Sequence, residues 1–244
     1  KVPSPKILLK AFEEVKPNLI LTVPLILEKI YKKMILPQLS KTTMKVALNI
    51  PLLDSRIYAQ IRKKLVDAFG GRFREVIVGG AAMNEEVTNF LYKIKFPFTI
   101  GYGMTECGPL ISYDHNDEYV PGSCGKLLKG IMKVRIDSED PYNKVGEIQV
   151  SGENVMKGYY KNEEATSKVF TEDGWLRTGD LGTIDADNRI YIRGRSKTMI
   201  LGASGQNIYP EEIESKLNNL PFVMESIIIE KNGKLVGLVY PDYD

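Results

Sequence analysis

Residues 74–102 constrain the fold of this chain more than any other segment. A β-branched run at its start predicts a strand, a turn rich in Gly and Ala follows, and residues 96–102 predict a second strand. Between the strands, Asn84 is suited to cap a helix that carries two glutamates in its first turn. Two strands joined through a helix run parallel in one sheet. Ligands of such sheets bind at the carboxyl ends of the strands, where residues 79–82 and 101–106 lie.

Three amphipathic helices and one further strand are predicted before this unit. Apolar side chains recur at helical spacing within residues 7–15, 25–36 and 57–69. Residues 19–23 form a short apolar run that predicts a buried strand. Apolar stripes of this kind belong to the core far more often than to a cofactor site, so we assign them no function.

The sequence changes character after Pro109. Alternating apolar residues and turns rich in Gly and Pro predict antiparallel strands in residues 110–195, arranged as a small, distorted β-barrel subdomain. Residues 196–244 predict the start of a small, mobile α+β domain, with a helix at Pro210 and a strand pair around Asn232 and Gly233. Ile213, Leu217 and Leu220 are expected to face its core. The predicted fold class is therefore α/β, with part of a parallel-sheet, nucleotide-binding subdomain in residues 1–109 followed by these two parts.

A β-hairpin is predicted around Asp187 and Asn188, because both residues tolerate the backbone of a tight turn. Asp180 lies just before its first strand and Arg195 just after its second, so the hairpin brings the two side chains to one end. A carboxylate beside a guanidinium can bind a vicinal diol such as that of a ribose. A surface ion pair, which contributes about 0–1 kcal/mol, explains the spacing equally well.

A second candidate site is the glycine-rich segment 101–109. Its glycines allow the backbone to approach a ligand closely. Tyr102 offers a flat ring for a base, Thr105 a hydroxyl donor, and Glu106 an oxygen ligand for Mg²⁺. Taken alone, the segment is explained better by a glycine-rich turn with a capping Thr and an exposed Glu.

Three separated motifs together resemble the adenylate-forming superfamily, which comprises acyl-CoA synthetases, luciferases and peptide-synthetase adenylation domains. They are Tyr-Gly-Met-Thr-Glu at residues 102–106, Trp-Leu-Arg-Thr-Gly-Asp at residues 175–180, and Arg-Ser-Lys at residues 195–197 with the segment 205–214 after it. A turn similar to the adenine-side turn of the family stands at residues 79–82. The order and the spacing match the family, and the resemblance covers essentially the whole chain.

The resemblance implies a role for each matching residue. Asp180 would bind the ribose hydroxyls of ATP or AMP, and Arg195 would assist it. Thr105 would contact the α-phosphate, and Glu106 would bind Mg²⁺. The resemblance also implies contacts with the nucleotide from five further residues, which are Gly79, Gly80, Ala81, Tyr102 and Gly103.

Two more residues are implied to act in the second half of the reaction. Lys197 matches the hinge about which the C-terminal domain of the family rotates between half-reactions. Many members have Asp at this position and others have Lys, so the departure is tolerated. Gly205 matches the place where the pantetheine of coenzyme A enters.

The implied activity is that of an AMP-forming fatty acid–CoA ligase. A fatty carboxylate would attack the α-phosphate of ATP, and the thiol of coenzyme A would then displace AMP, with Mg²⁺ as cofactor. Within the superfamily, the residues at positions 105–109 and 206–210 most resemble those of long-chain fatty acyl-CoA synthetases. Two alternatives stay open, which are an enzyme that activates amino acids or other carboxylates and a non-catalytic nucleotide-binding module of the same fold.

The two ends of the sequence suggest an internal fragment of a longer protein. The first residue is Lys1, not Met. A phosphate loop ending in Lys-Gly and a C-terminal catalytic lysine, both expected from the family, are not in the sequence. We therefore expect that this chain alone does not adenylate fatty acids at a useful rate.

Composition excludes several other classes. The net charge of +2 gives no pull toward nucleic acid. No apolar run is long enough to cross a membrane, which leaves only peripheral membrane contact open. Cys107 and Cys124 have no zinc-ligand or redox spacing, so a reducing cytoplasm is expected.

The only histidine, His115, could pair with Cys107 in a hydrolase, but no nucleophile elbow accompanies it, and a loop position is favoured. The sequence leaves acyl chain length and oligomeric state open.

Overall fold

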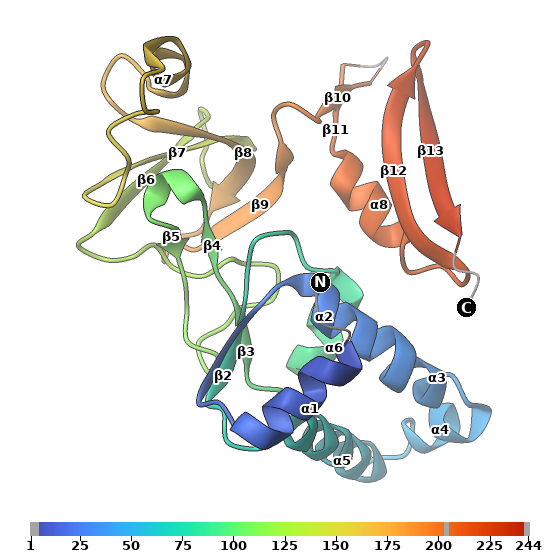
Figure 1. Ribbon diagram of the computed structural model, residues 1–244. Helices are drawn as coiled ribbons and strands as arrows, with labels where there is room; N and C mark the ends of the chain where they lie inside the picture. Colours follow the sequence, from blue (N-terminus) through green and yellow to red (C-terminus); the bar gives the residue numbers. More distant parts are fainter. Residues whose placement is uncertain (1–4, 203–204, 242–244) are drawn as a thin grey trace. The chain divides into compact units, whose positions relative to one another are not determined.

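The parallel sheet expected from residues 74–102 is present in the computed structural model, which describes residues 5–202 and 205–241 (Figure 1). Its strands are β1 (Leu19–Thr22), β2 (Glu75–Val78) and β3 (Phe98–Ile100), and β2 lies in the middle. Both strand pairs are parallel, and Thr22, Val78 and Ile100 stand in register at the carboxyl ends. The fold class is thereby confirmed in its first part.

The chain divides into two units. The first comprises residues 1–102 and 114–122, and the second comprises residues 103–113 and 123–244. The domain boundaries after residues 109 and 195 remain a proposal about the organisation of the whole protein.

The helices and strands of the first unit share its core. The helices are α1 (Pro5–Val15), α2 (Pro24–Ile30), α3 (Leu36–Leu39), α4 (Thr42–Ala47), α5 (Leu53–Ala68) and α6 (Glu85–Lys93). Phe69 at the end of α5 is fully buried, stacks on Phe12 of α1 with ring centroids 5.4 Å apart, and contacts the rings of Phe73 and Phe96. The apolar stripes that the sequence assigned to the core pack there in part. Phe12, Ile30 and Leu65 belong to the core cluster or pack against it. Ile7, Val15 and Met34 of the same stripes are exposed.

Two expectations for this unit need correction. The predicted helix 25–36 is present, but it widens to a π-helical turn at Tyr31–Ile35, between α2 and α3. Pro37 in α3 lacks an amide hydrogen and its ring crowds the carbonyl four residues earlier, which gives a reason for the wider turn. The strand β1 is not buried as expected. Ile20 is buried while Leu19 is 50% and Leu21 74% exposed, because successive side chains of a strand point to opposite faces and, among the described residues, the face that carries Leu19 and Leu21 is left open.

The second unit is built on an antiparallel sheet. Its strands are β6 (Met132–Asp137), β7 (Gly146–Gly152), β8 (Leu176–Ile184) and β9 (Ile190–Arg195), in that spatial order. The helix α7 (Glu163–Val169) precedes β8, and β4 (Tyr102–Gly103) and β5 (Leu110–Ser112) flank a 3₁₀ turn at Thr105–Cys107. Inward side chains such as Ile148, Val150 and Leu176 are buried. Antiparallel pairing is as expected, but within the described residues the four strands form an open sheet rather than a closed barrel.

The hairpin of β8 and β9 forms where the sequence predicts it. Asn188 adopts a left-handed backbone with φ of +61°. The carboxylate Oδ1 of Asp185 accepts hydrogen bonds from the amides of Asp187 and Arg189, each at 2.9 Å. These contacts are local, which is why the sequence alone could predict the turn.

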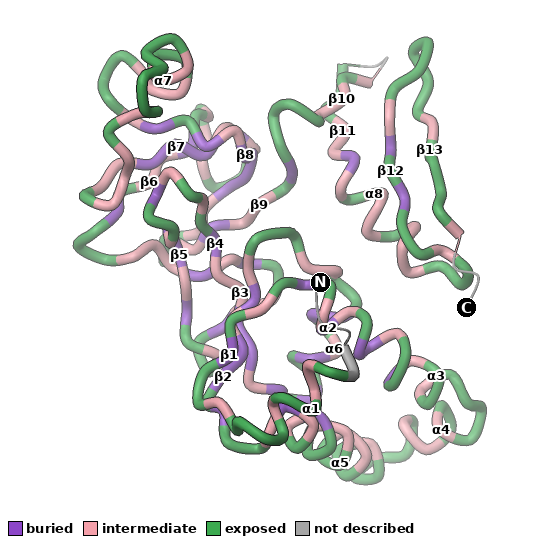
Figure 2. The backbone as a smooth tube through the Cα atoms, viewed as in Figure 1, coloured by how far each residue is buried: buried purple, intermediate pink, exposed green. Residues whose placement is uncertain are grey.

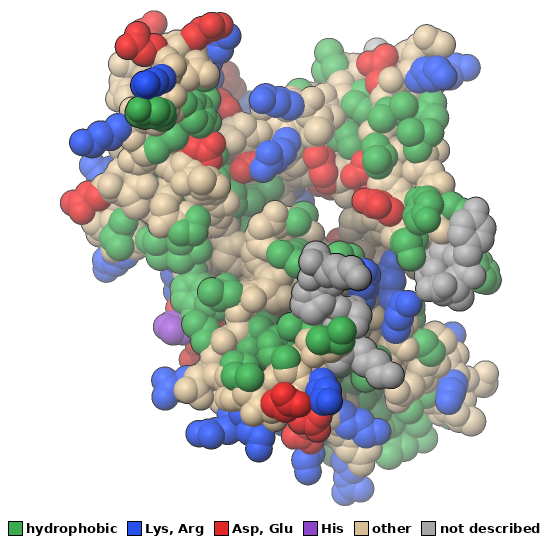
Figure 3. Space-filling model, viewed as in Figure 1, with side chains coloured by type: hydrophobic (Ala, Val, Ile, Leu, Met, Phe, Trp, Pro, Cys, Tyr) green, Lys and Arg blue, Asp and Glu red, His purple; other side chains and the backbone are tan. Residues whose placement is uncertain are grey.

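The C-terminal part contains β10 (Ile200–Leu201), β11 (Asn207–Ile208), α8 (Pro210–Leu217), β12 (Val223–Lys231) and β13 (Lys234–Pro241). The helix begins at Pro210 and the strands pair around Asn232 and Gly233, as predicted. The β12–β13 hairpin is mostly exposed (Figure 2), and hydrophobic side chains gather over it (Figure 3). Leu220, expected to face a core, is 53% exposed.

We expect the substitution Asn84→Ala to destabilise α6 by about 1 kcal/mol. The side-chain oxygen of Asn84 accepts hydrogen bonds from the amides of Glu86 at 3.0 Å and Val87 at 3.3 Å, which otherwise lack a partner within the helix. Urea unfolding followed by circular dichroism measures the change. Asn84→Ser keeps a capping oxygen and should recover most of the stability, and equal losses in both variants would contradict the capping role.

Candidate nucleotide-binding site

Asp180 and Arg195 form the ion pair that the hairpin predicted. They stand opposite each other in the register of β8 and β9, and Arg195 Nε lies 3.1 Å from Asp180 Oδ1. Both residues lie inside the strands rather than beyond their ends. The Asp180 side chain is 8% exposed and that of Arg195 is 69% exposed. A carboxylate buried to this extent is unusual for a surface ion pair and favours a functional or structural role.

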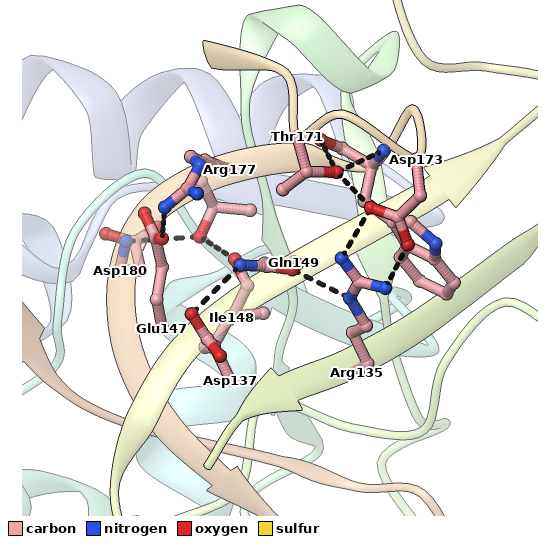
Figure 4. Close-up of polar contacts among 11 residues, drawn as sticks. Arg135, Asp137, Glu147, Ile148, Gln149, Thr171, Asp173, Arg177 and Asp180 are labelled. Atoms are coloured by element: carbon pink, nitrogen blue, oxygen red, sulfur yellow. Dashed lines mark hydrogen bonds and ion pairs between the residues drawn. The ribbon is translucent and has the colours of Figure 1, made fainter. Parts of the chain in front are cut away.

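The residues before Asp180 fix its backbone. The hydroxyl Oγ1 of Thr178 donates to the carbonyl of Ile148 at 2.8 Å and accepts from the amide of Asp180 at 3.1 Å (Figure 4). Gly179 has φ of +73°, a conformation that side chains rarely adopt, and its carbonyl accepts from the amide of Ser196 at 2.9 Å. The Thr-Gly-Asp sequence therefore has a structural role, because these residues bend β8 and hold Asp180 in place.

A polar network holds the other end of the same motif. Arg135 of β6 donates through Nε to Gln149 Oε1 at 2.7 Å and pairs with Asp173 (Figure 4). Hydrogen bonds from Arg135, and then from Thr171, hold the pKa of Asp173 well below its usual range. The Arg135 guanidinium also lies 4.7 Å from the ring centroid of Trp175. Trp175, the first residue of the motif, is therefore fixed to the sheet by contacts that the sequence did not predict.

The second candidate segment forms the 3₁₀ turn at Thr105–Cys107. Thr105 is exposed and Glu106 is half-buried. The hydroxyl of Tyr159 donates to Glu106 Oε1 at 2.9 Å, and this hydrogen bond to the carboxylate raises the pKa of Tyr159. Tyr102 is only 7% exposed, so little of its ring face is open within this chain. A Cβ at Gly103 would collide with the carbonyl of Pro109, because the two ends of the segment approach closely there.

The turn predicted to lie beside adenine follows the carboxyl end of β2. The amide of Gly79 donates to the carbonyl of Thr22 at 3.1 Å, and Gly80 has φ of +86°. Ala81 is exposed. The position at the carboxyl edge of the sheet is as expected. Gly79, Gly80 and Ala81 belong to the first unit with Tyr102, and their contact with a nucleotide stays a prediction.

The remaining predicted residues lie in the second unit. The unit contains Gly103, Thr105, Glu106, Asp180, Arg195, Lys197 and Gly205, and an ion pair joins Asp180 and Arg195 directly. Lys197 is exposed in the turn after β9, and Gly205 is exposed with open space above its Cα. The hydroxyl of Thr198, next to Lys197, donates to Glu211 Oε1 of α8 at 2.6 Å.

Glu106 is suited to hold Mg²⁺ only together with a phosphate ligand. Among the described residues, no group of three or more His, Cys, Asp or Glu side chains could hold a metal ion. Mg²⁺ is commonly bound through one or two carboxylates together with waters and substrate phosphates. A single half-buried carboxylate at a turn fits that manner of binding.

Cys107 is unsuited to be the nucleophile of a hydrolase that pairs it with His115. Cys107 is fully buried, and burial raises the pKa of its thiol to about 11. His115 lies in a loop of the other unit, as favoured from the sequence, with Nδ1 3.6 Å from Glu75 Oε1. It lines a pocket of about 960 Å³ beside Asn18 and Glu75, at the amino-terminal ends of β1 and β2. That pocket contains none of the predicted site residues.

Comparison with known proteins settles the family. The profile described as AMP-binding enzyme matches residues 1–160. The chain belongs to the AMP-binding enzyme family. The resemblance stated from the motifs is thereby confirmed.

Relatives of this AMP-binding chain include CoA ligases with different substrates in their names. Long-chain-fatty-acid–CoA ligase 1 of Saccharomyces cerevisiae is 28% identical over 250 residues, which cover 95% of this chain and 36% of the relative. The 4-coumarate-CoA ligase 2 of Narcissus pseudonarcissus is 34% identical over 196 residues, which cover 75% of this chain and 34% of the relative. The chain therefore spans about a third of the length of these relatives.

Solved structures share the fold of this AMP-binding chain. MatB from Rhodopseudomonas palustris with ATP bound aligns with a TM-score of 0.72 and 27% identity, over 98% of this chain and 43% of that one. The o-succinylbenzoate coenzyme A synthetase of Bacillus subtilis, in complex with ATP and magnesium ion, aligns with a TM-score of 0.69 and 26% identity, over 96% of this chain and 43% of that one. The predicted mixed α/β fold is that of these enzymes.

Segments 154–159 and 135–149 contain the residues that sequence reasoning missed. Tyr159 and Asn154 contact the turn at residues 105–110. Arg135, which donates to Gln149, contacts Trp175 and Asp173. No spacing rule joins these positions to their partners, since the separation between Tyr159 and Glu106 is 53 residues. The sequence signal for Tyr159 was a pair of tyrosines after Gly158. Their hydroxyls can donate hydrogen bonds, but the sequence does not show which group accepts them.

Proposed function

We propose that this chain is part of an AMP-forming ligase that activates a long-chain fatty acid with ATP and transfers the acyl group to coenzyme A. The observation that carries the proposal is the buried Asp180 carboxylate paired with Arg195, within a motif that resembles the adenylate-forming superfamily. Residues 1–160 of the same chain match the AMP-binding enzyme family. A buried acceptor beside a forked donor suits the two hydroxyls of a ribose.

In this proposal, each half of the reaction depends on positioning and charge neutralisation. Asp180 accepts hydrogen bonds from the ribose hydroxyls and Arg195 holds the carboxylate, while the exposed Thr105 donates to the α-phosphate. Glu106 would hold Mg²⁺, which would neutralise phosphate charge. The fatty carboxylate attacks the α-phosphorus and pyrophosphate leaves. The sulfur of coenzyme A then attacks the acyl carbon and AMP leaves.

The adenine and coenzyme A ends complete the proposed site. Gly79, Gly80 and Ala81 would lie on the adenine side of the nucleotide, and Tyr102 and Gly103 would also contact it. Lys197 is the hinge of the C-terminal domain, which its exposed turn after β9 supports. Gly205 lies where pantetheine enters, and the open space above its Cα supports a close approach.

The acyl substrate is the least constrained part of the proposal. Relatives named for long-chain fatty acids and for 4-coumarate match the chain at similar identity. We favour a long-chain fatty acid because the sequence motifs lean that way. A 4-coumarate-like aromatic acid is the second candidate, supported by the relatives from Narcissus pseudonarcissus.

Other properties follow from composition and chemistry. Cys107 and Cys124 are free thiols, which suits a reducing compartment, and we propose a cytoplasmic location. Among the described residues, every helix is too short or too polar to span a lipid bilayer. The proposed partners are the small-molecule substrates, without nucleic acid. Peripheral membrane contact and oligomeric state are left open.

The test is a substrate panel on the full-length protein. Palmitate, 4-coumarate and a mixture of amino acids are each supplied with ATP, Mg²⁺ and coenzyme A, and thioester and AMP are measured by mass spectrometry. We expect palmitoyl-CoA and AMP. Thioester formation from 4-coumarate alone would identify the aromatic acid as the substrate in place of the fatty acid. If no substrate supports ATP–pyrophosphate exchange, the protein would be a non-catalytic nucleotide-binding module. The isolated chain of 244 residues should show no exchange.

A further inference from the structure

The segment 154–159 fixes the backbone of the turn at residues 105–110. The amide Nδ2 of Asn154 donates to the carbonyls of Cys107 at 2.6 Å and Leu110 at 2.9 Å. The amide of Met156 donates to the carbonyl of Glu106 at 2.7 Å. These three hydrogen bonds hold the carbonyls of the turn and leave the side chain of Glu106 to be held by another group.

Tyr159 supplies that contact. Its hydroxyl donates to Glu106 Oε1 at 2.9 Å, and its residue is 37% exposed. The Tyr159 amide donates to Thr166 Oγ1 at 2.9 Å, and Thr166 Oγ1 in turn donates to the carbonyl of Asn162. The tyrosine is thus tied to the start of α7 at its backbone, so its hydroxyl can hold the Glu106 carboxylate in one orientation.

The neighbouring Tyr160 makes no comparable contact with the turn. It is 89% exposed, and its ring lies 5.3 Å from the ammonium of Lys161. The two consecutive tyrosines therefore have the same side chain in two different environments. Tyr160 is a matched internal control for any role assigned to Tyr159.

We propose that Tyr159 is a positioning residue for the Mg²⁺ ligand Glu106. The inference rests on the proposed function, in which Glu106 holds Mg²⁺ beside the phosphates. With Oε1 accepting from the Tyr159 hydroxyl, Oε2 would be the oxygen that binds the metal. Partners of a ligating carboxylate orient it and raise metal affinity, and their loss typically costs about 10- to 100-fold.

The test separates metal-linked binding from nucleotide binding as such. The affinity of the full-length protein for ATP is measured by calorimetry, without an acyl substrate, in Mg²⁺ and again in EDTA. The gain in affinity on adding Mg²⁺ is the readout. We expect Tyr159→Phe to reduce this gain about 10-fold while the affinity in EDTA stays unchanged, because the ring is kept and only the hydroxyl is removed. Tyr160→Phe should match the wild type, and Glu106→Gln should remove the gain.

The outcomes distinguish this inference from the proposed function. A wild-type gain that persists in full in Tyr159→Phe, while Glu106→Gln abolishes it, overturns the role of Tyr159 and keeps the proposed function. Equal losses in EDTA and in Mg²⁺ for Tyr159→Phe mean a purely structural role and also overturn the inference. Absence of any gain in the wild type overturns the proposed role of Glu106 and this inference with it.

Discussion

Asp180→Ala is expected to weaken ATP binding by the full-length protein at least about 100-fold, since each hydrogen bond to a charged group contributes about 1.5–3 kcal/mol and a diol makes two. The substitution removes a buried acceptor and leaves Arg195, which is 69% exposed, to be hydrated. Calorimetric titration with ATP measures the loss. Acyl-adenylate formation should fall at least as far.

Asp187→Ala is the matched control. Asp187 belongs to the same hairpin and also pairs with an arginine, with Arg189 Nη1 2.7 Å from its Oδ2. It lies at the turn, whereas Asp180 lies at the other end of the strands. We expect wild-type ATP affinity in this variant. Equal affinities in the two variants and the wild type, with both proteins folded by circular dichroism, would remove Asp180 from the proposed site.

Phe69→Ala is expected to destabilise the first unit by about 3–5 kcal/mol, because a fully buried ring leaves a cavity that its neighbours fill only in part. Phe69 is 0% exposed and its ring contacts Phe12, Phe73 and Phe96. A loss of that size is a large fraction of the stability of a domain. Urea unfolding followed by far-ultraviolet circular dichroism measures it.

Phe222→Ala carries the same substitution at a surface position. Phe222 is 80% exposed, so removing its ring changes little buried area. We expect unfolding within about 0.5 kcal/mol of the wild type. If Phe69→Ala were no more destabilising than Phe222→Ala, the cluster of four phenylalanines would not be the core of this unit.

Much of the fold follows from residues that are near each other in the sequence. The cap at Asn84, the turn at Asn188 and the helix start at Pro210 all form where the sequence predicts them. Each depends on contacts within a few positions, so the residue types alone identify them. The Asp180–Arg195 pair follows in the same way, because the hairpin turn sets its register.

Expectations failed where burial depends on distant neighbours. Leu21 and Leu220 are apolar and were expected inside, yet they are 74% and 53% exposed. Local pattern indicates which residues can be buried, while the packing of other elements decides whether they are. The open sheet of β6–β9 has the same cause, since alternation predicts antiparallel strands but does not state whether the first and last strands meet.

The sequence by itself determined the parallel sheet, the hairpin and the family to which the motifs point. Only the tertiary structure joined Tyr159 to Glu106, 53 residues apart, and Arg135 to Asp173, 38 residues apart. Hydrogen bonds of this kind form because strand pairing and helix packing bring remote segments together. Side-chain identity sets what each group can donate or accept, and the fold selects its partner.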